Sequence, residues 1–380
     1  MSKPGNDRIN TDPADHTRDE VSADPVDRTR DEVSTDPIDR TRDEVSADPV
    51  DRTRDEVSTG SGSDRVDGER ATSSANVDPV ATAPRTDFHA GYVALIGRPN
   101  AGKSTLLNRL VGQKIAAVSD KPQTTRFRIQ GVITEAEGQV VLVDTPGVHL
   151  PGYELNRRMM VAVQDALLGV DLVCLIRDAS ASTGNGDRFV LDLVKRAEKP
   201  ALLLLNKIDK LEDKSALLPL IDWYRNEYDW REIIPISALK EELIDEVLAA
   251  SLRHLPEGEP IFSEDELTDQ SLRVLVSEIV REKILQVTGD EIPYVTAVVT
   301  ERFEEVREDF ARINCLIVVE RQSQKKIVIG RGASRLKEIG IRARRDVEEL
   351  LDHRVHLELF VKVEEDWRNS PRLLDEFGLE

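Results

Sequence analysis

A glycine-rich segment, preceded by an apolar run and followed by a helical pattern, constrains this 380-residue chain most strongly. Residues 97–104 read G-R-P-N-A-G-K-S and fit the pattern G-x-x-x-x-G-K-[ST] of a phosphate-binding loop. Residues 92–96 predict a buried strand, and residues 105–110 predict the start of a helix. This order aims the loop N–H groups and the helix N-terminus at phosphate oxygens. A chance glycine-rich turn is the alternative, and the flanking strand and helix argue against it.

The residues of this loop have separate expected roles. Lys103 is predicted to reach the β- and γ-phosphates, and Ser104 is predicted to bind Mg²⁺. Glycines let the backbone wrap the phosphates closely. The other loop positions expected to contact nucleotide are Gly97, Arg98, Pro99, Asn100, Ala101, Gly102 and Thr105.

A second motif, D-T-P-G at residues 144–147, follows the apolar run 140–143. An aspartate at the end of a parallel strand can hold Mg²⁺ through water, which is the role expected of Asp144. Gly147 is expected to present its backbone N–H near the γ-phosphate. The predicted nucleotide contacts here are Asp144, Thr145, Pro146, Gly147 and Val148.

Two more motifs indicate which base is bound. Asp209, in N-K-I-D after the apolar run 201–205, can accept two hydrogen bonds from the N1–H and N2–H₂ edge of guanine. Adenine lacks this pair of donors, so GTP and GDP are the predicted ligands, with Mg²⁺. Asn206 is expected to brace neighbouring loops, and the Lys207 stem to cover the base. The predicted contacts are Asn206, Lys207, Ile208, Asp209, Ser237, Ala238 and Leu239, the last three directing N–H groups at guanine O6.

All four motifs follow apolar runs, as expected for ligand sites at the carboxyl ends of strands in open α/β sheets. The sequence therefore predicts an α/β fold with a doubly wound, mostly parallel sheet. The block resembles the G domain of translation-factor-class GTPases.

A polar segment at 121–126 is expected to act as a switch, with Thr125 reaching Mg²⁺ when the γ-phosphate is present. An ordinary polar loop is the alternative. The predicted catalytic residues are Lys103, Thr125 and Gly147. Val148 stands where Ras-like GTPases place a water-orienting glutamine, so hydrolysis should be slow or the water positioned otherwise.

Asn100 resembles the asparagine of potassium-stimulated GTPases. One hypothesis is that K⁺ joins Mg²⁺ as a second cation and replaces an arginine finger. The alternative is that Asn100 only stabilises the loop.

The N-terminal region differs in composition. Residues 11–58 hold four copies of a twelve-residue unit close to A-D-P-V-D-R-T-R-D-E-V-S. Each copy has few apolar residues and one proline, which predicts a disordered acidic tail over residues 1–89, with a folded or partner-induced element as the alternative. Acidic residues in this tail contribute to the formal net charge of −20, so the net charge of the whole chain does not reveal a basic segment elsewhere in the sequence.

That basic segment lies between Arg321 and Arg345, where Glu338 is the only acidic residue. Such a segment is the footprint expected for a phosphate backbone, although charge runs are often only solvated helix faces. Around it, residues 271–380 predict the order helix–strand–strand–helix–helix–strand of an α+β type II KH domain. The predicted RNA-binding residues are Lys325, Lys326, Gly330, Arg331, Gly332, Ala333, Ser334, Arg335 and Lys337.

The whole arrangement resembles the Era family of bacterial GTPases. The resemblance rests on residues 97–105, 123–126, 144–149, 206–209, 319–330 and 356–363. It predicts a G domain over 90–256, a linker over 257–270 and a KH domain with a C-terminal extension over 271–380. One departure is Ala333, which stands where the family's G-x-x-G loop has its second glycine.

The resemblance implies a GTP-hydrolysing protein that binds the 3′ end of 16S ribosomal RNA and assists assembly of the 30S subunit. It also implies peripheral contact with the inner face of the cell membrane. No apolar run approaches the roughly 20 residues of a membrane span, so we expect a cytoplasmic protein. We also expect a monomer. Competing interpretations are an RNA-binding scaffold with incidental hydrolysis, a tandem-G-domain relative and a membrane-recruited GTPase. A single P-loop argues against the tandem form.

Overall fold

The computed structural model describes residues 87–121, 123–147, 152–289 and 292–379. All of these belong to the second of the chain's two units, which begins at Asp78. The twelve-residue repeats lie outside the described residues, so the disordered tail stays a prediction. Among the described residues, no helix combines the length and apolar character needed to cross a membrane.

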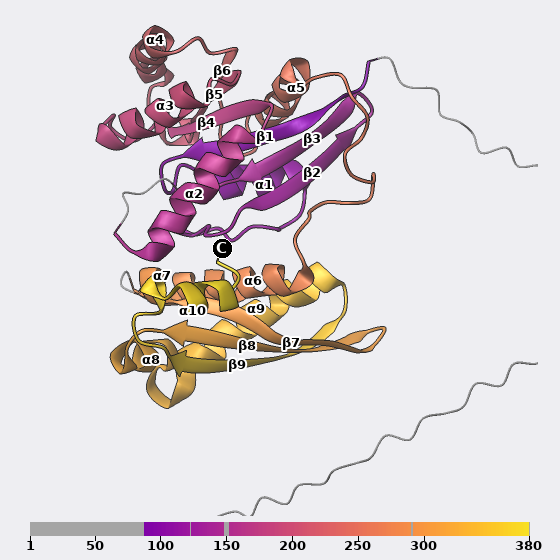
Figure 1. Cartoon of the computed structure of the whole chain (residues 1–380), viewed down its shortest axis with the longest axis vertical. Coiled ribbons are helices and arrows are strands. Elements are labelled where there is room, and N and C mark those ends of the chain that lie inside the picture. Colours follow the sequence, from indigo (N-terminus) through magenta and orange to yellow (C-terminus); the bar gives the residue numbers. More distant parts are fainter. Residues whose placement is uncertain (1–86, 122, 148–151, 290–291, 380) are drawn as a thin grey trace, which may run out of the picture. The chain divides into compact units, whose positions relative to one another are not determined.

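The first domain is built on a six-stranded sheet with the order β2-β3-β1-β4-β5-β6 (Figure 1). Neighbouring strands are parallel except β2 and β3, which are antiparallel. This confirms the predicted doubly wound, mostly parallel sheet. Its elements are β1 (His89–Gly97), α1 (Lys103–Val111), β2 (Ile129–Glu135), β3 (Gly138–Asp144), α2 (Glu154–Leu168), β4 (Leu172–Asp178), α3 (Asn185–Ala197), β5 (Ala201–Asn206), α4 (Leu217–Glu227), β6 (Glu232–Pro235) and α5 (Ile244–His254).

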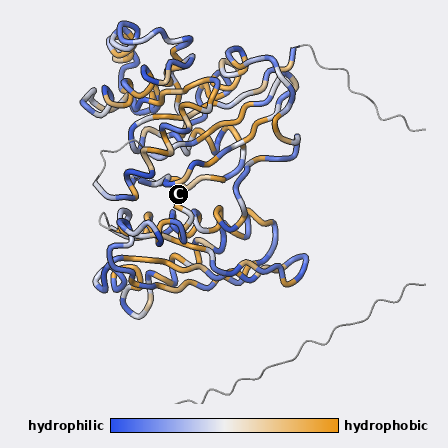
Figure 2. Tube along the Cα trace, viewed as in Figure 1, coloured by the Kyte–Doolittle hydropathy of each residue, from blue (hydrophilic) through white to orange (hydrophobic). Residues whose placement is uncertain are grey.

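The central strands are apolar on both faces because helices cover both sides of the sheet. Alternate residues of β1 and β4 enter two separate cores, one formed with α1 and α5 and the other with α2, α3 and α4. Hydrophobic stretches accordingly follow the strands (Figure 2). Cys174 in β4 is free and buried, and burial raises the pKa of its thiol to about 12, so it behaves as a small apolar core residue.

The second domain has a three-stranded sheet with the order β7-β8-β9, in which β7 and β8 are antiparallel and β8 and β9 parallel. The predicted α+β order of a KH domain is therefore confirmed (Figure 1). Its elements are α6 (Leu272–Val287), α7 (Ile292–Val295), β7 (Ala297–Arg307), β8 (Phe310–Val319), α8 (Gln322–Ile329), α9 (Ser334–Leu351), β9 (Arg354–Val363) and α10 (Pro371–Glu376).

Both faces of this smaller sheet are packed. On one face, apolar side chains of β8 and β9 form a core with α6, α8 and α9. On the other, Trp367 is fully buried with residues of α10 and with Leu155 and Met159 of α2. The C-terminal extension therefore joins the KH sheet to a helix of the G domain.

The segment between the two domains has no helix, and it lies along β2, the edge strand of the first sheet. The Leu267 carbonyl accepts from the Val132 N–H at 2.9 Å, which covers an otherwise open strand edge. Gln139, fully buried in β3, fixes the segment further. Its Oε1 accepts from the N–H groups of Ile261 at 2.7 Å and Phe262 at 2.9 Å, and its Nε2 donates to the Phe262 carbonyl at 2.9 Å.

Replacing Gln139 by leucine should lower the free energy of unfolding by about 2 kcal/mol, because backbone groups of the interdomain segment lose their partners. Urea denaturation of the full chain measures this. Gln286→Leu is the control, since Gln286 is exposed and its partner Glu282 keeps other hydrogen bonds. Equal stability of the Gln139 variant and the wild type would contradict the assigned anchoring role.

Candidate functional site

The end of β1 and the loop that leads to α1 contain two positions where only glycine fits. A Cβ on Gly97 would lie 2.4 Å from the Ile176 carbonyl oxygen, and a Cβ on Gly102 would lie 2.2 Å from Asn206 Nδ2. Gly102 also has φ of 104°, which favours glycine. Close packing of the loop against β4 and β5 thus explains the glycine spacing seen in the sequence.

Lys103 is the first residue of α1 and is buried. Its ammonium lies 3.3 Å from the Gly97 carbonyl oxygen and 3.4 Å from that of Arg98, so it curls back over the loop. Burial lowers the pKa of Lys103, while the negative charge of Asp144 opposes the shift. A phosphate bound at this loop would supply the anion that a buried ammonium needs.

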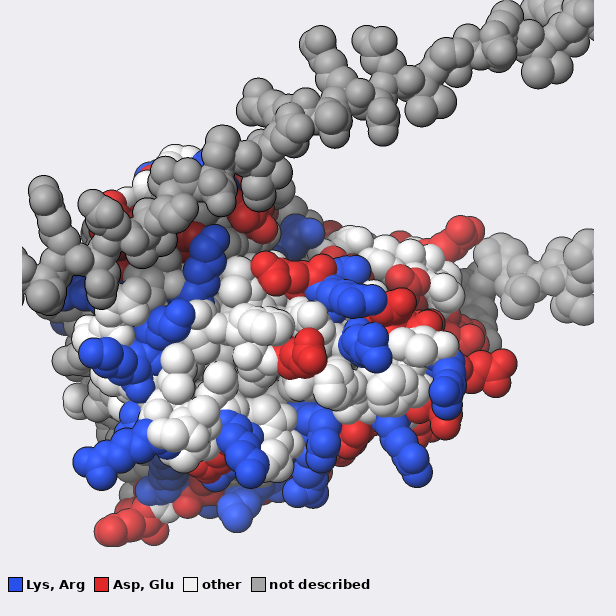
Figure 3. All heavy atoms as spheres, turned by 90° about the horizontal axis from the view of Figure 1, so that it is seen from below, with Lys and Arg blue, Asp and Glu red and all other residues white. Residues whose placement is uncertain are grey.

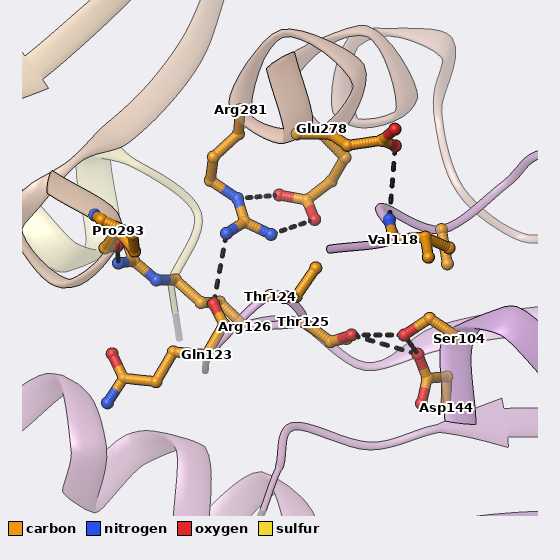
Figure 4. Close-up of polar contacts among 12 residues, drawn as sticks. Ser104, Val118, Gln123, Thr124, Thr125, Arg126, Asp144, Glu278, Arg281 and Pro293 are labelled. Atoms are coloured by element: carbon orange, nitrogen blue, oxygen red, sulfur yellow. Dashed lines mark hydrogen bonds and ion pairs between the residues drawn. The ribbon is translucent and has the colours of Figure 1, made fainter. Parts of the chain in front are cut away.

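Three oxygen-bearing side chains from separate segments meet beside the loop (Figure 4). Ser104 Oγ lies 2.6 Å from Asp144 Oδ2 and 2.7 Å from Thr125 Oγ1, and Thr125 Oγ1 lies 3.2 Å from the same carboxylate oxygen. The structure therefore brings together the three residues that the sequence assigned to Mg²⁺. Thr124 is not part of this group, because its hydroxyl donates to the Lys121 carbonyl.

The chemistry of this group fits Mg²⁺, which prefers oxygen ligands. Asp144 is fully buried, and its Oδ1 has no hydrogen-bond partner among the described residues. Burial raises the pKa of Asp144, although Lys103 and the two hydroxyls oppose that shift. A cation beside Oδ1 would satisfy the buried carboxylate.

The side chain of Asn206 joins three loops. Its Nδ2 donates to the Ala101 carbonyl at 2.8 Å, and its Oδ1 accepts from the N–H groups of Lys207 at 2.8 Å and Ala238 at 3.0 Å. The phosphate loop, the N-K-I-D segment and the S-A-L segment are therefore held at one edge of the sheet.

Lys207 crosses toward the phosphate loop. Its ammonium donates to the Asn100 carbonyl at 2.6 Å and to Asp178 Oδ2 at 2.7 Å. Asp178, at the end of β4, was not among the residues selected from the sequence, because no motif marks it. The Asn100 amide donates to the Asp120 carbonyl, which fits the loop-stabilising interpretation of Asn100, and the potassium hypothesis stays a prediction.

Asp209 lies in a short 3-10 turn, Ile208–Lys210, and accepts from the Ser237 hydroxyl at 2.5 Å. The hydroxyl of Ser237 also accepts from the Lys240 N–H at 3.1 Å, which closes the S-A-L turn. The predicted guanine-selecting carboxylate and the S-A-L segment are thus directly linked.

Some predicted residues use their side chains elsewhere. Arg98 pairs with Asp187 at 3.0 Å, and the Thr145 hydroxyl donates to the Leu95 carbonyl at 2.8 Å. Val148 lies outside the described residues. The cavity beside the phosphate loop is also lined by Gln123 and Thr124 of the switch segment and by three residues that no motif announced, namely Ala117, Val118 and Ser119.

In the KH domain, the loop between α8 and α9 has three positive-φ residues. Gly330 has φ of 74°, Gly332 of 54° and Ala333 of 61°. Ala333 therefore adopts the left-handed conformation that the position demands, even though it carries a Cβ, and α9 begins directly after it at Ser334. The apolar spacing of the sequence predicts a helix over residues 341–351, but α9 begins earlier, so that Gly340 lies inside it, where an added Cβ would lie 3.6 Å from Leu359 Cδ1.

Most basic residues of the segment 321–345 are exposed, including Arg331, Arg335 and Lys337. Figure 3 shows many lysine and arginine side chains on the face seen from below, with acidic side chains among them. A largely open hollow adjoins the loop. Its lining residues are Ala333, Leu336, Lys337, Gly340, Ile341, Arg344, Leu357 and Leu359, a mixture of apolar and basic groups that suits bases and phosphates together.

Comparison with known proteins relates each of the two domains to a protein family. Residues 92–207 match the family described as 50S ribosome-binding GTPase, and residues 291–368 match the KH domain family. The chain is 46% identical over 293 residues to GTPase Era of Trichlorobacter lovleyi, covering 77% of this chain and 98% of that protein.

Two solved structures are similar over 77% of this chain and 99% of theirs, each with 40% identity and a TM-score of 0.74. One is an Era variant from Aquifex aeolicus bound to GDP and AlF₄⁻. The other is Era in complex with MgGDPNP and nucleotides 1506–1542 of 16S ribosomal RNA.

Asp209→Asn should weaken GTP binding about 100-fold and favour xanthosine triphosphate, because the amide offers a donor where guanine needs an acceptor. Equilibrium binding of GTP and of xanthosine triphosphate measures this change in base preference. Asp213→Asn is the matched control, since Asp213 only caps the turn at Ser215. Full retention of GTP affinity would remove Asp209 from its assigned role.

Proposed function

The chain belongs to the Era family of GTPases, and from this premise we propose that its GTPase cycle serves binding of the 3′ end of 16S ribosomal RNA and assembly of the 30S subunit. The observation that carries the proposal is the joining, in one chain, of a guanine-nucleotide site and a KH loop flanked by basic residues. The related Era complex contains both MgGDPNP and a 16S ribosomal RNA segment, which supports the same pairing here.

At the G site, the roles proposed for the residues follow from their positions. The phosphate loop and Lys103 bind and orient the β- and γ-phosphates, and Ser104, Thr125 and Asp144 would hold Mg²⁺. When bound, that ion neutralises charge on the phosphate oxygens. Asp209, braced by Ser237, selects guanine, and Gly147 presents its N–H toward the γ-phosphate side.

Hydrolysis is proposed to be slow without a partner. Val148 has an aliphatic side chain that cannot orient water, so positioning must come from backbone groups, from a K⁺ ion near Asn100 or from bound RNA. This feature also favours the second candidate, an RNA-binding scaffold in which GTP is mainly a ligand. Turnover that accelerates when RNA is added supports the first function over the second.

At the KH domain, the proposed RNA site combines the loop at 330–333 with the hollow along α9 and β9. Loop N–H groups and basic side chains would contact phosphates, and the apolar lining would receive bases. The proposal extends to a monomer that works in the cytoplasm, and to peripheral contact with the inner face of the membrane, which the family resemblance implies.

Titration with an oligonucleotide from the 3′ end of 16S ribosomal RNA should give tighter binding in the presence of a GTP analogue than of GDP, because a switch must bind its partner differently in its two states. Fluorescence anisotropy measures both affinities, and a scrambled oligonucleotide controls for charge alone. Absence of binding in both states would overturn the proposed RNA partner.

Ala333→Gly should stabilise the chain by about 1 kcal/mol, since it removes a Cβ from a left-handed residue. It should also tighten RNA binding severalfold, because the exposed loop can then approach the RNA backbone more closely. Asp352→Gly is the control: Asp352 has φ of 54° at the other end of α9, so it should gain stability without a change in RNA affinity. Unchanged RNA affinity of the Ala333 variant would mean that the alanine loop already binds well.

A further inference from the structure

The segment Gln123–Arg126 of the G domain is tied to the KH domain by two arginines (Figure 4). Arg126 projects into the KH domain, where its Nη1 donates to the Thr296 carbonyl and its Nη2 to the Pro293 carbonyl, each at 2.7 Å. These carbonyls belong to α7 and the residue that follows it. One side chain thus bridges the switch segment of one domain and the backbone of the other.

The second tie runs in the opposite direction. Arg281, on α6 of the KH domain, donates from Nη1 to the Gln123 carbonyl at 3.2 Å. Its Nε and Nη2 donate to the Glu278 carboxylate at 2.8 Å and 2.6 Å, and both side chains are buried. A bidentate pair of this kind fixes the orientation of the guanidinium.

Gln123 itself has φ of 60°, a conformation that a residue with a Cβ rarely adopts. The Arg281 contact to its carbonyl and the contact of its Nε2 with Asn156 Oδ1 at 3.0 Å hold it there. Such a conformation persists only where the surroundings over-determine it.

Between the two ties lies Thr125, whose hydroxyl is 2.7 Å from Ser104 Oγ and 3.2 Å from Asp144 Oδ2. Thr125 directly precedes Arg126 in the chain, so the position of one backbone limits that of the other. The residue that reaches the metal site is therefore bracketed on both sides by contacts to the KH domain.

Arg126 is costly to bury, which argues against a passive role. The residue is 4% exposed, its Nε has no hydrogen-bond partner among the described residues, and its guanidinium lies 5.6 Å from the ring centroid of the buried Trp367. No carboxylate is recorded within ion-pair distance of this described side chain, so its partners are neutral carbonyls and an aromatic ring.

We propose that Arg126 and Arg281 are positioning residues through which the KH domain holds Thr125 in place for Mg²⁺. The contact between the domains is then coupled to Mg²⁺ binding at the nucleotide-bound site, so that each favours the other. Loss of either tie frees the segment 123–126. Part of the free energy of Mg²⁺ binding is then used to order Thr125, so the affinity for Mg²⁺ falls. The inference rests on the GTPase site alone and does not require the proposed RNA partner.

The test uses the full chain and a fluorescent, non-hydrolysable GTP analogue, whose release is followed as Mg²⁺ is titrated. Arg126→Ala should raise the Mg²⁺ concentration that half-maximally slows release by about tenfold. Arg126→Lys should fall between this variant and the wild type, because one ammonium cannot reproduce the two-carbonyl fork. Release in excess chelator should be the same for all variants, since the phosphate loop and Asp209 are untouched.

Lys114→Ala is the matched control. Lys114 also joins the G domain to the KH domain, through Glu282 at 2.8 Å and Asp346 at 2.7 Å, but it has no contact with the segment 123–126 among the recorded ion pairs and hydrogen bonds of the described residues. Its Mg²⁺ titration should match that of the wild type.

Two outcomes would overturn the proposal: an Arg126→Ala titration that coincides with the wild type, or a Lys114→Ala shift of equal size, which would indicate general domain docking. If Arg126→Ala does not fold, Arg281→Lys replaces it. That variant can keep a charge beside Glu278 while losing the bidentate pair and the fork to the Gln123 carbonyl, and it should shift the titration in the same direction. Failure of RNA binding in the wild type would leave this test unaffected.

Discussion

The nucleotide site depends on the side-chain amide of Asn206, because its hydrogen bonds join three loops. Its Nδ2 holds the carbonyl of Ala101 and its Oδ1 holds the N–H groups of Lys207 and Ala238. The contact is possible only because Gly102 has no Cβ, which would lie 2.2 Å from Nδ2. The glycine of the first motif and the asparagine of the third therefore depend on each other for their packing, although they lie 104 positions apart in the sequence.

The parallel sheet explains why these loops can meet. Strands β3, β1, β4, β5 and β6 run in the same direction, so their carboxyl ends lie at one edge. The strands use their backbone groups for hydrogen bonds within the sheet, and their side chains pack in the two apolar cores. The polar side chains that can bind a ligand therefore lie in the loops at the strand ends. Asp144 shows the consequence, since it is fully buried at a strand end and yet accepts hydrogen bonds from the hydroxyls of Ser104 and Thr125.

The KH domain contributes more than a second binding surface. Its sheet is packed on both faces, and the second face is covered by Trp367 and α10 together with Leu155 and Met159 of the G domain. Buried polar contacts add to this apolar contact, with Arg126 and Arg281 reaching across in opposite directions. Because polar groups buried in this way must keep their partners, the geometry of the contact is more strongly specified than apolar burial alone would achieve.

The sequence by itself determined the G-domain class and the KH order and predicted which residues bind guanine and the metal ion, because glycine, lysine, aspartate and apolar runs at fixed spacing have local physical causes. It even marked Ala333 as exceptional before its φ of 61° was known. Tertiary structure decided what local spacing cannot encode: that Arg98 and Thr145 turn away to Asp187 and Leu95, that Asp178 supports Lys207, and that Gly340 lies within α9. It also determined that the segment 123–126 contacts the KH domain twice, through Arg126 and through Arg281. The contacts of these two arginines join residues more than 150 positions apart, and only the packed chain determines which residues meet.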